Sequence, residues 1–275
     1  MRGRSNNNMA AEIPRLHLEL NPNRLSEIVG SAVFASTEVV NLHFRALATE
    51  NLDESLESSG VVFKFKGPDL DQDQRRAMHE SWILGKAFQE LLRAVRHTLE
   101  EAYVMAVLLT QEHKIRSDGT LANFLKPFQR KATDLSFPDL LATVNKLLDP
   151  KLEFSDSYKS LQVARNCLEH RAGIVSDAES KGGPAFTFDV PRVKIFYLRG
   201  QDEIEVTAGE RVDAGDGRPE VEVLMKFEVR KRSVPVGERL KFSLIEFNEI
   251  AFACNFLGQQ LASRLPKPKL SVSGT

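Results

Sequence analysis

The chain carries the stretch Leu161-Gln162-Val163-Ala164-Arg165-Asn166-Cys167-Leu168-Glu169-His170, in which apolar residues recur at the spacing of a helix. An arginine, a polar amide and a histidine share this helix, and no metal-ligand or nucleophile motif lies nearby in the sequence. An arginine can hold a phosphate through its planar fork of donors, and a histidine can give or take a proton near neutral pH. The stretch therefore indicates metal-free phosphodiester chemistry.

The helix is predicted to span roughly residues 157–175 and to be buried on two sides. Its main apolar stripe consists of Leu161, Ala164, Leu168, Ala172 and Val175. At 100° per residue, the polar residues fall outside this stripe. A second apolar strip, formed by Val163, Cys167 and Ile174, lies beside His170, and we expect it to pack against another helix or a partner chain.

Residues 165–170, Arg-Asn-Cys-Leu-Glu-His, resemble the signature of the HEPN superfamily, in which an arginine and a polar residue precede a histidine by a few positions. Many members are metal-independent endoribonucleases whose two motif copies face each other in a dimer; others bind nucleotides or proteins without cutting. The resemblance implies that Arg165, Asn166 and His170 are catalytic. Asn166 would orient His170, and Glu169 would fix Arg165 as a supporting residue.

Each of these residues also has a simpler interpretation. Arg165 and Glu169 lie four apart, the spacing of an ordinary ion pair on a helix surface. Asn166 is compatible with a buried polar residue, and His170 with a satisfied core or helix-end histidine. The sequence thus leaves two rivals to the nuclease: a non-catalytic HEPN-like module that binds a nucleotide or a protein, and an unrelated α+β regulatory protein.

The composition describes a globular chain without a global charge. The 275 residues are 42% hydrophobic and carry a formal net charge of −1, so any RNA binding must come from a local patch. The strongest local positive charge is Arg230-Lys231-Arg232, near Arg239 and Lys241. Arg230, Lys231 and Arg232 are candidates for RNA contact; the sequence favours the alternative, a solvated strand end and loop, because no aromatic platform interleaves with these charges.

Several common chemistries lack their motifs. The sequence contains no phosphate-binding loop, dinucleotide-binding turn, nucleophile elbow or zinc-ligand pair, so it predicts neither a cofactor nor a metal. Cys167 and Cys254 lie within apolar helical patterns and predict no disulfide. Neither a signal-peptide hydrophobic region nor a run of about 18 apolar residues occurs, which predicts a cytoplasmic protein without a membrane partner.

The periodicities predict an α+β fold: a predominantly α-helical, HEPN-like bundle with a small antiparallel β insertion before the last helix. Helical spacing covers about 22–50, 69–109, 121–132, 137–148, 157–175 and 243–265, and Trp82 belongs to an expected core face. Alternating segments between 186 and 229 predict a half-buried sheet, with Val223, Met225 and Phe227 opposed to the charged residues between them. Residues 61–66 predict a short strand or extended connection.

Four divisions of the chain are expected. They are a flexible leader at 1–20, a HEPN-like bundle at 21–180 plus 242–265, a β-rich insertion at 184–234 and a flexible tail at 266–275. The function expected from the resemblance is RNA cleavage by a homodimer with a toxin, defence or RNA-processing role. Its partners would be RNA, a second copy of the chain and a protein antitoxin or regulator.

Overall fold

The computed structural model of the protein describes residues 19–52, 67–110, 120–206, 212 and 221–267. Several predicted features lie outside these residues: nearly all of the leader, the extended segment at 61–66 and most of the tail. The elements of the described part are α1 (Asn23–Thr49), α2 (Gln72–Thr110), α3 (Leu121–Asp134), α4 (Phe137–Leu147), α5 (Ser155–His170), α6 (Asp177–Ser180), β1 (Ala185–Arg199), β2 (Asp202–Glu205), β3 (Val223–Pro235) and α7 (Leu244–Arg264). This order confirms the predicted α+β class, in which helices dominate and a small sheet precedes the last helix.

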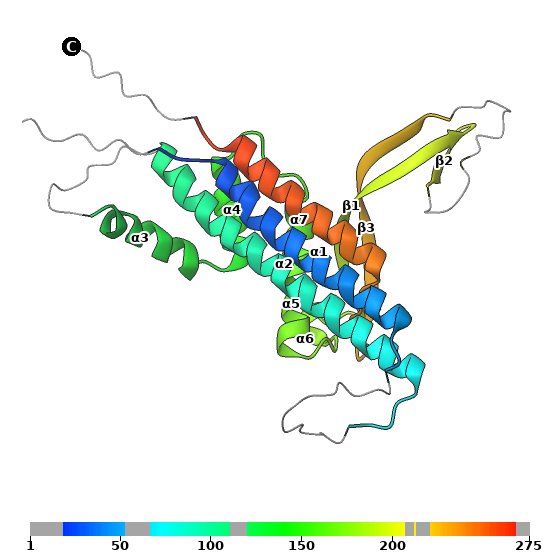
Figure 1. The fold of residues 1–275 in the computed structure, drawn as a ribbon. Helices are drawn as coiled ribbons and strands as arrows, with labels where there is room; N and C mark the ends of the chain where they lie inside the picture. The colour runs from blue at the N-terminus through cyan, green and yellow to red at the C-terminus, as the bar shows by residue number, and fades with distance from the viewer. Residues whose placement is uncertain (1–18, 53–66, 111–119, 207–211, 213–220, 268–275) are drawn as a thin grey trace, which may run out of the picture.

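Helix α2 is the centre of the bundle and contacts α1, α3, α4, α5 and α7. In Figure 1, α1, α2 and α7 run side by side as one layer, and α4 and α5 lie behind it. From Ile83 to Val107, apolar residues occupy several faces of α2, which is the pattern of a helix covered on more than one side. Trp82 is instead 60% exposed, so its predicted place in the core is wrong: no described element covers this line of α2.

Helix α5 ends at His170, five residues before its predicted end. The backbone N–H groups of Arg171 and Gly173 both donate to the carbonyl oxygen of Cys167 at 3.0 Å. Ala172 and Gly173 have φ angles of +51° and +82°, a left-handed conformation that stops a helix. Ile174 then forms a β-bridge with Arg239 instead of continuing the helix.

Of the two alternatives expected for the second apolar strip of α5, the structure shows packing within the chain, at Val163 and Cys167. Ile174 is no longer on the helix, and Cys167 is fully buried in the same core as Leu161 and Ala164. The hydroxyl of the buried Tyr158, also on α5, donates to the carbonyl oxygen of Ala253 at 2.7 Å. The apolar side of α5 is thus used within the chain, against α7 and the rest of the bundle.

The sheet is antiparallel with the strand order β2-β1-β3. Phe186, Phe188 and Val190 in the first half of β1 are buried, where the strand packs against α5 and α7. The far end of the sheet extends away from the helices in Figure 1. The apolar face of β3 is buried only in part: Phe227 stacks on Phe256 of α7 with ring centroids 4.7 Å apart, but Met225 is 73% exposed. Glu228, on the opposite face, is half-buried.

Candidate functional site

Three predicted site residues form a connected row of polar side chains on α5. Arg165 makes an ion pair with Glu169, one helical turn further on. The amide oxygen of Asn166 accepts a hydrogen bond from Gln162 Nε2 at 3.0 Å and a longer one from Arg165 Nη1 at 3.4 Å. The predicted contact between Glu169 and Arg165 is present, and it holds the guanidinium along the helix surface.

His170 is the last residue of α5, and its side chain is 62% exposed. Its Nε2 lies 3.8 Å from Glu169 Oε2, the carboxylate oxygen that also contacts Arg165. The carboxylate beside the imidazole is that of Glu169. The Asn166 oxygen accepts from Gln162 and Arg165, and the orientation of His170 by Asn166 stays a prediction. One carboxylate thus lies between the guanidinium and the imidazole.

The turn that follows His170 brings further charged residues to this end of α5. Arg171 pairs with Glu179, which is buried. Burial alone would raise the pKa of Glu179, but hydrogen bonds from Ser176 and Arg171 outweigh it and lower the pKa. Arg239 Nη1 donates to the carbonyl oxygen of Ala172 at 2.6 Å.

Two of these residues were not predicted to belong to this region. Arg239 was grouped with the basic strip of β3, but it lies beside the turn after α5, 67 positions away from its acceptor in the sequence. No sequence pattern signals a contact across that separation. Glu179 had a readable signal, because Ser176 and Glu179 form a capping box at the start of α6.

The basic strip on β3 is largely neutralised by acidic residues of other elements. Arg230 Nη2 lies 2.8 Å from Glu249 Oε1 on α7, and Arg232 pairs with Glu246 one turn earlier on the same helix. Lys231 is exposed and has no ion pair with a described residue. The contact of this strip with RNA stays a prediction, with Lys231 as its most accessible cation.

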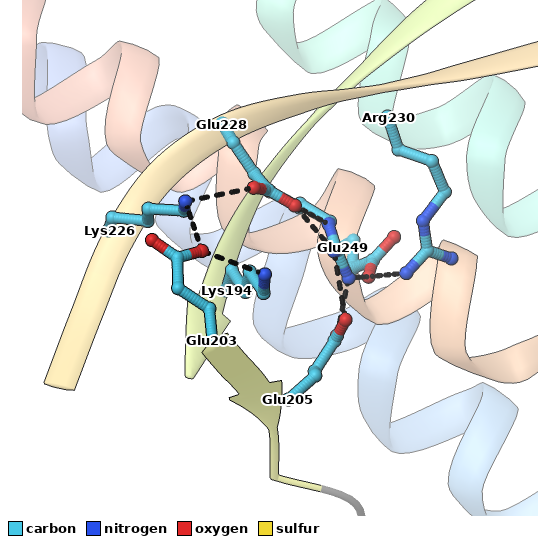
Figure 2. A network of polar contacts seen from close by, with 8 residues as sticks. Lys194, Glu203, Glu205, Lys226, Glu228, Arg230 and Glu249 are labelled. Atoms are coloured by element: carbon cyan, nitrogen blue, oxygen red, sulfur yellow. Dashed lines mark hydrogen bonds and ion pairs between the residues drawn. The ribbon is translucent and has the colours of Figure 1, made fainter. Parts of the chain in front are cut away.

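The pair of Arg230 with Glu249 belongs to a larger network on the charged side of the sheet, shown in Figure 2. Arg192 of β1 is only 8% exposed and is surrounded by carboxylates from β2, β3 and α7: Glu205 at 2.5 Å, Glu228 at 2.5 Å and Glu249 at 3.4 Å. Hydrogen bonds from Arg192 lower the pKa of Glu205, whereas burial raises the pKa of Glu249. This network ties the sheet to α7 and accounts for the half-buried charges of β3.

No group of three or more His, Cys, Asp and Glu side chains among the described residues is placed to hold a metal ion. Among the same residues, no helix combines the length and the apolar character needed to cross a membrane. Comparisons with protein-family profiles, with curated proteins and with solved structures give no significant match, so the resemblance of residues 165–170 to the HEPN signature stays a prediction.

Proposed function

We propose that the chain is a metal-independent endoribonuclease that cleaves RNA through attack of a 2′-hydroxyl on the adjacent phosphate. The observation that supports it is the contact of Arg165 and His170 with a common carboxylate, Glu169, at an end of α5 where the imidazole is open to solvent. A guanidinium beside an accessible imidazole supplies a phosphate clamp and a proton carrier.

The proposed step divides the work between Arg165 and His170. A bound phosphate competes with Glu169 for Arg165, whose donors then stabilise the charge that develops on the pentavalent phosphorus. His170 takes the proton of the 2′-hydroxyl as the bond from the 2′-oxygen to phosphorus forms. The bond to the 5′-oxygen breaks, and that oxygen is protonated by a second imidazole, which a homodimer would provide. The products are a 2′,3′-cyclic phosphate and a 5′-hydroxyl.

The partners and the setting follow from the same proposal. RNA is the substrate, the activity is placed in the cytoplasm, and a toxin, defence or RNA-processing role would require control by a protein antitoxin or regulator. Val163 and Cys167 of the expected dimer seam pack within the chain, so the dimer of this proposal would form around the exposed His170 at the end of α5.

A non-catalytic binding module is the second candidate, and one observation favours it. Arg165 is already paired with Glu169, and such a pair on a helix contributes only about 0.3–0.5 kcal/mol when it is a surface feature. In that case the row from Gln162 to Glu169 stabilises α5 and takes no part in chemistry.

Cleavage of RNA in excess EDTA tests the proposal. The wild-type chain is expected to cut, and His170→Ala to lose activity while its circular dichroism is unchanged, because the exposed imidazole adds little to the core. Cleavage that disappears on chelation and returns with a divalent metal, or that persists in His170→Ala, contradicts the mechanism.

Arg165→Lys separates the nuclease from the binding module. It keeps the charge but loses the planar geometry, so turnover should fall at least tenfold while RNA affinity changes little. The matched control is Arg130→Lys, because Arg130 forms an exposed i,i+4 pair with Asp134 on α3 and has no role in the site. If the two substitutions have equally small effects on cleavage, Arg165 is only a structural residue.

A further inference from the structure

The outer sides of α1 and α2 form an apolar groove of about 630 Å³, lined on α1 by residues that include Ala32, Ala35 and Val39 and on α2 by residues that include Trp82 and Lys86. No described element covers it. The groove lies between the two longest helices of the bundle, which run antiparallel in Figure 1. It is separate from the polar row on α5.

Helix α1 has two apolar sides, and only one of them faces the bundle. Leu25, Val29 and Val40 are fully buried between α1 and its neighbours α2 and α7. A second row follows the spacing 4-3-4-3-4: Ile28, Ala32, Ala35, Val39, Leu42 and Ala46. Leu42, in this row, is 63% exposed. This alternation of three and four is the seam of a coiled coil, and the small residues at its centre allow another helix to approach closely.

The level of each α1 residue along α2 follows from one contact. The rings of His43 on α1 and His79 on α2 lie 5.7 Å apart, so these two residues are at the same height along the helix pair. Because the helices are antiparallel, a step forward on α1 corresponds to a step back on α2. An α1 residue and an α2 residue are therefore at the same height when their numbers sum to about 122. The lining of the groove agrees: its α1 residues span 28–39, which this relation matches to 83–94, and its α2 residues span 82–97. Glu38 therefore lies at the level of residue 84 on α2, about 3 Å along the axis from Lys86.

We propose that a second copy of this chain covers this face, with the two α1–α2 pairs forming a four-helix bundle around a twofold axis parallel to the helices. A rotation about this axis changes neither the direction of a helix nor the height of its residues. It therefore places α1 of one copy opposite α2 of the other, and these two helices are antiparallel with the same pairing of heights as within one chain. The exposed row of α1 enters the groove, and Glu38 of one copy comes within reach of Lys86 of the other. Glu38 makes no ion pair with a described residue of its own chain.

Charge and area both favour this arrangement. If the twofold axis instead crossed the helices, α1 would face α1, and each Glu38 would lie near its own copy, where like charges repel. The row from Ile28 to Ala46 covers 18 residue steps, which is about 27 Å along the helix axis. The two helices α1 and α2 are together about 20 Å wide, so the face that they present has a projected area of roughly 540 Å². The accessible area of such a ridged surface is larger and approaches the ~800 Å² that each partner buries in a standard interface.

The mass of the full chain in solution tests the inference, measured by light scattering at micromolar concentrations. We expect twice 30.8 kDa for the wild type. Val39→Asp should produce a folded monomer, because it places a charge in the seam. Ile245→Asp is the matched control: Ile245 is 66% exposed on α7 and does not line the groove, so this variant should stay dimeric.

A charge exchange identifies the partner surface. Glu38→Lys and Lys86→Glu should each weaken the dimer several-fold, and the double variant should restore it, because the attraction is re-formed with reversed signs. A wild-type monomer, a dimer that persists in Val39→Asp, or a double variant no tighter than the single ones overturns the inference. The groove is separate from the polar row on α5, so this dimer does not by itself supply the second imidazole of the proposed cleavage. A wild-type monomer contradicts both proposals, whereas a dimer that persists in Val39→Asp contradicts only this interface, and a dimer without activity on RNA contradicts only the nuclease.

Discussion

Gly258 of α7 marks the closest approach of α7 to α1, and Gly258→Ala is expected to destabilise the protein. A β-carbon at this position would overlap Val29 Cγ1 and would lie 3.2 Å from Ser26 Cα and 3.3 Å from the Leu25 carbonyl oxygen. Two of these atoms belong to the backbone. The third belongs to a valine, whose side chain strongly prefers one rotamer in a helix and cannot turn away freely. Helix α1 must therefore shift.

The magnitude follows from two opposing effects. Overpacking of a well-packed core costs about 1–3 kcal/mol, and replacing a glycine inside a helix by alanine returns about 1 kcal/mol. Because two of the three contacted atoms are backbone, the overpacking cost should lie in the upper part of its range, about 2–3 kcal/mol, and we expect a net loss of about 1–2 kcal/mol in the free energy of unfolding. Gly30→Ala in α1 is the matched control, because the nearest atom to its β-carbon is Asn255 Oδ1 at 3.6 Å, an ordinary contact. This variant should gain up to about 1 kcal/mol.

Urea unfolding followed by circular dichroism measures both variants. A lower midpoint with an unchanged slope for Gly258→Ala, and a midpoint at or above that of the wild type for Gly30→Ala, would support the packing of α1 against α7. If Gly258→Ala is as stable as the wild type, the two helices do not approach each other as described, and the face of α1 assigned to the groove would also have to be reassigned.

Two further predictions concern buried groups. Arg192→Leu leaves Glu205, Glu228 and Glu249 without their shared cation and should cost about 3 kcal/mol near pH 7. Because Arg192 lowers the pKa of Glu205, this stabilisation is present above the ordinary glutamate pKa of about 4.3 and is lost as the pH falls through the lowered value. The deficit of the variant in urea unfolding should therefore shrink in acid, and a deficit independent of pH would refute the role of the network. Burial raises the pKa of Cys254 to about 12, so its thiol should resist a disulfide reagent at about pH 8 until the chain is unfolded, and rapid reaction in the native state would contradict its burial.

The sequence by itself determined the type and order of the long elements, although not the short α6, because these depend on local periodicity and on residues near each helix end. The last helix shows this clearly: its apolar residues repeat at helical spacing, and Ser243 with Glu246 forms the capping box that starts it. The polar row on α5 was also readable, because Arg165 and Glu169 are neighbours through the helix itself. Their role in RNA cleavage stays a prediction, since contacts within one helix are made by structural and catalytic pairs alike.

Only the tertiary structure decided which faces are covered. Alternation in β3 separated apolar from charged residues but could not tell which side faces outward, and Glu249 of α7 and Arg192 of β1 turned the charged side inward. The end of α5 was missed because Ala172 and Val175 continue the apolar period, while left-handed backbone at Ala172 and Gly173 and pairing with residues near Arg239 stop the helix. These outcomes depend on partners tens of residues away, whose positions a local pattern does not encode.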